Sequence, residues 1–328
     1  MLARLRRPVS PEAYRRVTVL ALVLLVFIVV TGAGVRLTGS GLGCTDWPNC
    51  TDRRFVAELE THQLVEFVNR LITGLVSAAV AIAVLGSLRR TPRRPDLVWL
   101  SWGLVAGVVA QIVLGGVVVK SDLNPWLVQG HFLVSMLLVA DAVVLTHRSG
   151  LPDDRPNRPA VTPALLGWGR LLVALGAVVV LTGTLVTGSG PHSGHNPADV
   201  TRIRRLPLHP HDAARIHGTA MVAFLAVTVW VLVQLRRHGS PELVSRATAL
   251  VTVLALQGAL GYAQYFTGVP PLLVGLHVLG ASLVWVAVLQ TYLAMTAPVG
   301  RPAAGPAQSS GGPARTDHLA HRDLLTRP

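Results

Sequence analysis

The sequence predicts an all-α integral membrane protein with eight transmembrane helices. Of its 328 residues, 51% are hydrophobic and only 14% are charged, whereas soluble domains carry about a quarter charged residues. The mean hydropathy is +0.52, and long uncharged stretches recur along the chain. These observations favour lipid as the main solvent and exclude an ordinary soluble enzyme.

Eight uncharged stretches are each long enough to cross a hydrocarbon core as a helix, which takes about 20 residues. They cover residues 17–35, 66–88, 97–119, 127–147, 168–187, 213–235, 247–267 and 271–294. The first stretch is not predicted to be a cleaved signal peptide, because no clear small-residue cleavage site follows it. Each stretch is therefore interpreted as one span.

The basic residues indicate the orientation of the spans. With an even number of spans, both termini lie on one side of the membrane, and 20 of the 29 Lys and Arg residues lie on that side. Short cytoplasmic loops carry an excess of Lys and Arg. We therefore predict a multi-pass protein of the cell (plasma) membrane with both termini cytoplasmic. The net charge of +13 then needs no anionic partner, and nucleic acid is excluded as a ligand.

The two halves of the chain resemble each other, which indicates a duplicated unit. The matching segments are 38–41 with 187–190, 111–115 with 257–261, and His131 with His277. Because each unit has an even number of spans, the repeats are parallel. The sequence therefore predicts two pseudo-symmetric parallel four-helix bundles.

The predicted domain organisation follows from this duplication. Residues 1–147 form the N-terminal bundle, 148–163 a cytoplasmic linker and 164–297 the C-terminal bundle. Residues 298–328 are rich in Pro, Ala, Gly and Ser and lack apolar periodicity. We interpret them as a disordered cytoplasmic tail.

Four histidines lie at or just inside predicted spans, at one depth near the outer leaflet: His62, His131, His217 and His277. Ionisable side chains in a span are costly and usually face the bundle interior. Imidazoles on facing helices can ligate a haem iron from both sides, and His217 with His277 is the better-matched pair. The loop histidines His192, His195, His209 and His211 are instead predicted to be solvated.

The first half differs from the second at one ligand position. Asn69 occupies the place that corresponds to His217, while His62 lies seven residues earlier and Glu66 lies between them. This spacing lets all three side chains face one cavity. Glu66 could move protons or stabilise a charged intermediate, and an ion pair with Arg70 at i+4 is the alternative.

The two cysteines of the chain, Cys44 and Cys50, share the first outer loop. Six residues apart in an oxidising compartment, they could readily form a disulfide. Such a disulfide could be a structural staple. It could equally be redox-active, because a small exposed loop disulfide is easier to reduce than a buried one.

Through residue 297 the sequence resembles the haem A synthase family. The resemblance rests on the segments 38–44 to Cys50, 62–70 and 129–131, and on His217 and His277. It implies oxidation of the C8 methyl group of haem O to a formyl group through two successive hydroxylations. It also implies haem b, with its iron, bound by His217 and His277, haem O as substrate in the first half, and Glu66 as the catalytic residue.

The resemblance leaves the ligand of the substrate iron open. Many family members carry a histidine where this chain has Asn69, so His62, Asn69 or His131 alone could hold haem O. The implied partners are haem O, the prenyltransferase that makes it (haem O synthase), a membrane electron acceptor and the lipid bilayer. A homo-oligomer is compatible with the sequence.

Two other functions compete with this interpretation. A di-haem membrane cytochrome b that carries electrons to or from quinone would need two comparable bis-histidine sites, and Asn69 disfavours the first of them. A transporter with a parallel duplication would explain the repeat but not the four histidines at one depth.

Overall fold

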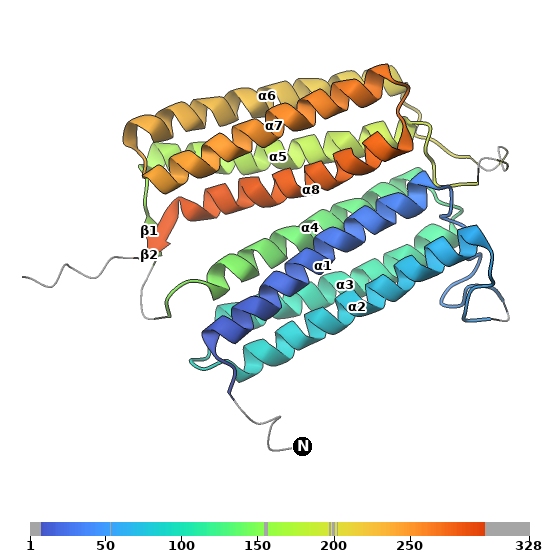
Figure 1. Ribbon diagram of the computed structural model, residues 1–328, viewed down its shortest axis with the longest axis horizontal. Helices are drawn as coiled ribbons and strands as arrows, with labels where there is room; N and C mark the ends of the chain where they lie inside the picture. Colours follow the sequence, from blue (N-terminus) through green and yellow to red (C-terminus); the bar gives the residue numbers. More distant parts are fainter. Residues whose placement is uncertain are drawn as a thin grey trace, which may run out of the picture. The chain divides into compact units, whose positions relative to one another are not determined.

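The structure, a computed structural model, describes residues 8–52, 54–153, 157–196, 198, 201 and 203–298. In this part of the chain, eight helices are long and apolar enough to span a membrane (Figure 1). They are α1 (Pro11–Leu37), α2 (Thr61–Arg89), α3 (Pro95–Lys120), α4 (Pro125–Ser149), α5 (Pro163–Ser189), α6 (Pro210–His238), α7 (Pro241–Phe266) and α8 (Pro271–Ala294). The predicted all-α membrane fold with eight spans is confirmed. The predicted tail beyond residue 298 lies outside the described residues.

Most of the helices begin earlier than the sequence predicted. α1, for example, begins at Pro11 rather than at residue 17, and seven of the eight helices begin with proline. Proline suits the first helical position, where the missing N–H would have no intrahelical partner. Side chains such as Ser10, Thr162 and Ser240 cap these starts by accepting from backbone N–H groups. Hydropathy identifies only the apolar part of each helix and therefore misses these polar first turns.

The helices contact one another in two sets (Figure 1). Within α1–α4, consecutive helices are in contact and α1 also contacts α4; within α5–α8, consecutive helices are in contact and α5 also contacts α8. Contacts of α4 with α5 and of α8 with α1 and α4 join the sets. The pseudo-symmetry of the two sets stays a prediction.

Many large apolar side chains point away from the protein interior. Trp99 is 77% exposed, and Leu137 and Leu181 are also exposed in mid-helix. Isolated apolar side chains on a soluble protein surface are common, but large exposed apolar side chains on all eight long helices are typical of a lipid-facing surface. The exterior therefore agrees with the multi-pass membrane protein that the helix lengths indicate.

One end of the helices lies nearest to the four predicted site histidines, which are within about two turns of the starts of α2, α4, α6 and α8. We call it the histidine end, formed by residues 38–60, 121–124, 190–209 and 267–270 as far as they are described. Its loops are tied together: the N–H of Gly41 donates to Gly194 O at 2.9 Å, and His192 Nε2 lies 2.8 Å from Val269 O.

The opposite end contains a structural element that the sequence did not predict. Strand β1 (Asn157–Pro159) pairs antiparallel with β2 (Thr296–Pro298), so the predicted linker is paired at its centre with the segment after α8. Nearby, Arg90 donates two hydrogen bonds to Asp153, at 2.8 and 2.9 Å, and the Arg90 side chain is fully buried.

Replacing Asp153 with alanine is expected to lower the free energy of unfolding by about 3 kcal/mol. Breaking a buried ion pair costs about 3–5 kcal/mol because it leaves a buried charge unpaired, and Asp153 is itself partly exposed. Thermal unfolding in detergent measures the effect. The control is Glu242→Ala, which removes an exposed pair with Arg246 and should cost under about 1 kcal/mol. Equal losses in the two variants would contradict the prediction.

Candidate functional site

His217 of α6 and His277 of α8 face each other near the histidine end. Their ring centroids lie 6.3 Å apart, with the ring planes at 75°. His217 Nδ1 is hydrogen-bonded to Thr182 Oγ1 of α5 at 3.2 Å, while His277 Nδ1 is buried without a hydrogen-bond partner. A pair of imidazoles on facing helices, one of them oriented by a hydroxyl group, is a suitable ligand set for a single metal.

Glycines on neighbouring helices make room for these two rings. A Cβ atom at Gly183 of α5 would lie 3.3 Å from His217 Cε1, and one at Gly261 of α7 would lie 3.3 Å from His277 Cε1. Both distances are shorter than ordinary contacts. A side chain at either position would therefore displace an imidazole by a few tenths of an ångström.

His131 of α4 has surroundings like those of His277. The side chain of Gln111 donates to His131 O at 3.0 Å, and the side chain of Gln257 donates to His277 O at 2.7 Å. A Cβ atom at Gly115 would also lie 3.4 Å from His131 Cε1, and His131 Nδ1 is buried without a partner. The repeat found in the sequence thus corresponds to a repeated contact.

The other two predicted haem-binding residues of the first half have different partners. His62 Nδ1 is hydrogen-bonded to Ser40 Oγ at 2.9 Å, and Asn69 Oδ1 accepts from Thr31 Oγ1 at 2.8 Å. Among the described residues, no hydrogen bond or ring contact joins His62 or Asn69 to His131. His131 is therefore the one of the three that shares its surroundings with a second-half histidine.

His62 lines a cavity of about 710 Å³ at the histidine end. The lining residues come from the first loop, the start of α2, the α3–α4 turn and the α5–α6 loop: Gly39, Leu42, Gly43, Thr45, Glu60, His62, Val119, Lys120, Asp122, His195 and Asn196. Glu60 caps α2 by accepting from the N–H groups of His62 and Gln63, and these bonds hold the pKa of Glu60 below its ordinary value.

Glu66 joins α2 to the disulfide loop. Glu66 is buried, and its Oε2 accepts from the N–H of Cys44 at 2.8 Å, while its Oε1 accepts from Arg70 Nη2 at 2.6 Å. The predicted alternative for Glu66, an ion pair with Arg70, is therefore present. The structure gives Glu66 a position between the helix and the loop, and its catalytic role stays a prediction.

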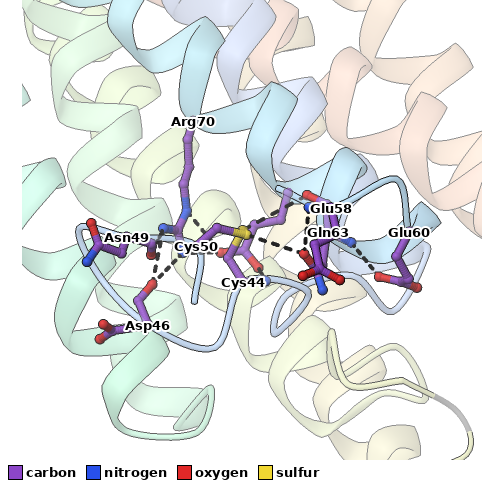
Figure 2. Close-up of a disulfide and its surroundings, with 9 residues drawn as sticks. Cys44, Asp46, Asn49, Cys50, Glu58, Glu60, Gln63 and Arg70 are labelled. Carbon is purple, nitrogen blue, oxygen red and sulfur yellow. Dashed lines mark hydrogen bonds and ion pairs between the residues drawn. A yellow bond between two sulfur atoms is a disulfide. The ribbon is translucent and has the colours of Figure 1, made fainter. Parts of the chain in front are cut away.

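Arg70 and Gln63 complete the attachment of this loop (Figure 2). Arg70 Nη1 donates to Asp46 O at 3.1 Å and to Asn49 O at 2.9 Å, on both sides of the loop tip. Gln63 Oε1 accepts from the N–H of Glu58 at 3.0 Å. Gln63, Glu66 and Arg70 follow one another at helical spacing on one face of α2. Sequence reasoning missed Gln63, although this spacing could have identified it.

The two cysteines form a disulfide. Both are fully buried, so the premise that this disulfide is exposed is wrong. The physical reason is the attachment just described, which holds the loop against α2.

The α5–α6 loop is also more buried than the sequence suggested. His195 is only 4% exposed, and its Nε2 lies 3.9 Å from Asp122 Oδ1 with no hydrogen-bond partner. His192 is partly buried and bonded to the α7–α8 turn. The prediction of solvated residues is wrong for these two. It is confirmed for His209 and His211, which are exposed.

Comparisons with known proteins give one family and several relatives that share one name. The family described as cytochrome oxidase assembly protein (COX15-CtaA) matches residues 15–63 and 55–289. A heme A synthase of Shouchella clausii is 28% identical over 179 residues, which cover 53% of this chain and 59% of the relative. One of Lysinibacillus sphaericus is 29% identical over 51% of the chain and 56% of the relative. One of Halalkalibacterium halodurans is 26% identical over 76% of the chain and 84% of the relative. The chain thus covers a little over half the length of the first two relatives and most of the third.

Proposed function

Since the chain belongs to the COX15-CtaA family of cytochrome oxidase assembly proteins, we propose that it is a haem A synthase. The reaction oxidises the C8 methyl group of haem O to a formyl group through successive hydroxylations, in haem A biosynthesis for terminal oxidases. The family match from residue 15 to residue 289 carries this proposal. It includes His62, His131, His217 and His277 and the disulfide loop.

The second half is proposed to bind haem b between His217 and His277. Two imidazoles that ligate one metal from opposite sides have centroids roughly 6 Å apart, since a metal–imidazole bond is about 2.0–2.1 Å and the ring nitrogen lies about 1 Å from the ring centre. The observed 6.3 Å fits this requirement. Thr182 would orient the His217 ring. When bound here, haem b would supply a one-electron redox centre.

The first half is proposed to bind haem O beside His131. We call the surroundings of His131, Glu66 and Asn69 the first-half site. The buried Nδ1 of His131 and its position beside Gly115 resemble the environment of His277, which supports His131 as a ligand of the substrate iron. His62 Nδ1 and Asn69 Oδ1 are hydrogen-bonded to Ser40 and Thr31. His62 would therefore have to ligate through Nε2, and Asn69 through the same amide oxygen that accepts from Thr31.

Glu66 is proposed to accept a proton during hydroxylation or to stabilise positive charge that develops at the methyl carbon. Each hydroxylation with water as oxygen donor breaks a C–H bond, forms a C–O bond and releases two protons and an electron pair. The carboxylate is already held by Cys44 N–H and Arg70. These bonds fix the position of the carboxylate between α2 and the disulfide loop.

The remaining parts of the proposal concern partners and orientation. The electron pairs require an acceptor in the membrane, and haem O requires a prenyltransferase that delivers it. We propose that the protein lies in the plasma membrane with the histidine end outside and both termini in the cytoplasm, because the termini and the loops assigned to the cytoplasm together carry 20 of the 29 Lys and Arg residues. The di-haem cytochrome would need a second bis-histidine site. It is disfavoured because the position that corresponds to His217 is Asn69, whose side-chain oxygen accepts a hydrogen bond from Thr31.

Haem analysis after co-expression tests the proposed function. In a host that makes haem O but lacks its own haem A synthase, expression of this chain should convert a measurable part of the haem O pool into haem A. Extracted pigments are separated and identified by absorption and mass. The same host with an empty vector is the control. A pool that stays entirely haem O, while the purified protein carries haem b, would reject the synthase and favour the electron-carrying cytochrome.

A further inference from the structure

Trp47, at the tip of the disulfide loop, packs against an unusual position of α3. Its indole ring covers Gly116 so closely that a Cβ atom there would lie 2.8 Å from Trp47 Cδ2 and 3.1–3.2 Å from two further ring atoms. Even an alanine at Gly116 would therefore push the indole away. α3 has no side chain where the loop places a large aromatic ring.

This contact lies beside the first-half site. Gly115, the residue before Gly116, is the glycine that approaches His131. Trp47 and His131 thus contact adjacent residues of one turn of α3. Because Gly115 and Gly116 are consecutive residues, Trp47 and His131 contact α3 at the same depth.

The corresponding position of the second half has a different residue. The residue that corresponds to Gly116 in the repeat is Tyr262, which is 63% exposed, and the residue that corresponds to Gly115 is Gly261. The repeat thus retains the glycine that accommodates the histidine in both halves, while the glycine that accommodates a tryptophan occurs only in the first. Helix packing alone does not require glycine at position 116, since the corresponding position of α7 has a tyrosine.

The loop holds Trp47 rigidly in place. The disulfide closes a ring from Cys44 to Cys50, and Arg70 donates to the carbonyls of Asp46 and Asn49, one residue before and two residues after Trp47. A side chain fixed before binding loses little conformational entropy when a ligand packs on it. Figure 2 shows this attachment, with Arg70 reaching from α2 to the loop.

We propose that Trp47 is a substrate-binding residue that forms an aromatic wall of the first-half site and packs against the macrocycle of haem O. This inference rests on the proposed function and adds a contact residue to it. Aromatic rings favour offset or edge-on packing against other flat π systems, and the porphyrin is such a system. Because Arg70 binds both the loop and Glu66, the same attachment sets the position of the wall relative to the carboxylate.

The experiment compares Trp47→Ala, Trp47→Phe and Gly116→Ala in the full-length protein. Trp47→Ala should raise the KM for haem O about tenfold, as expected for the loss of one aromatic stacking contact, with haem b content unchanged. Trp47→Phe should restore most of the affinity. Gly116→Ala, which displaces the indole, should raise the KM in the same direction. The controls are Trp99→Ala, at an exposed tryptophan, and Gly74→Ala, where a Cβ meets nothing within 4 Å.

A binding titration separates this inference from the proposed function. Haem O added to the wild type should quench tryptophan emission, and Trp47→Phe should lose a measurable part of that quenching even if no haem A forms. A wild type that makes no haem A rejects the synthase. Equal KM values for the wild type, Trp47→Ala and Gly116→Ala, or equal quenching in the wild type and Trp47→Phe, reject the contact. A loss of haem b in all three variants would show a structural role and also reject it.

Discussion

Alanine at His217 or at His277 is expected to remove the b-type haem from the purified protein. Each single substitution should lower the ratio of haem to protein by more than about tenfold, since even changes to groups that only orient a metal ligand cost about 10–100-fold in affinity. The motivating observation is the 6.3 Å separation of the two rings, one of which Thr182 orients. Visible absorption of the purified variants measures the result.

Two comparisons make this result specific. His238→Ala changes an exposed histidine at the other end of α6 and should leave the spectrum intact. Gly183→Ala should weaken haem binding because the new Cβ would lie 3.3 Å from His217 Cε1, whereas Gly258→Ala meets only Met221 at an ordinary 3.6 Å. If both histidine variants kept the full spectrum, haem would have to bind elsewhere in the protein.

The histidine environment was largely predictable because a repeat preserves contacts. The equal spacing of Gln111 to His131 and of Gln257 to His277 indicated a common arrangement, and in the structure both glutamines donate to the carbonyl of the histidine. The eight spans were predictable for a similarly general reason. Crossing a hydrocarbon core imposes a length and an apolar composition that a sequence displays directly.

The burial of the loops could not be predicted in this way. Cys44 and Cys50 are buried because Glu66 and Arg70 of α2 bind the loop backbone, and backbone atoms leave no signature in a sequence. His195 is buried by packing near Asp122, from the other half of the chain. A polar loop is exposed to solvent only when no segment from elsewhere in the chain covers it. The sequence of the loop itself does not show whether such a segment exists.

Glu66→Gln is expected to lower the rate of haem A formation by about 100-fold or more, the lower limit of what a positioned acid–base group contributes. The haem b content should stay unchanged, because Glu66 lies in the first half while His217 and His277 lie in the second. Glutamine keeps an oxygen that can accept from the Cys44 N–H but removes the negative charge. The rate is measured from haem A formed per unit of haem b, which corrects for folded protein.

The comparison with Glu66→Ala decides between chemistry and structure. Alanine removes the bonds to Cys44 and Arg70 as well as the charge, so it should loosen the disulfide loop. If Glu66 only held the loop, glutamine would retain most of the activity and alanine would lose it. If the carboxylate takes part in the reaction, both variants should be inactive, and near-normal turnover of Glu66→Gln would contradict that role. Glu242→Gln, at an exposed ion pair, serves as the control.

Arg70 gives an independent check on the same question. Arg70→Met removes the counterion of Glu66 and the bonds to Asp46 O and Asn49 O, while the bond from Cys44 N–H to Glu66 remains possible. A reacting carboxylate would then stay in place with an altered charge environment, so activity should fall less than in Glu66→Gln. A purely structural clamp predicts the reverse order, because Arg70 holds two points of the loop and Glu66 only one.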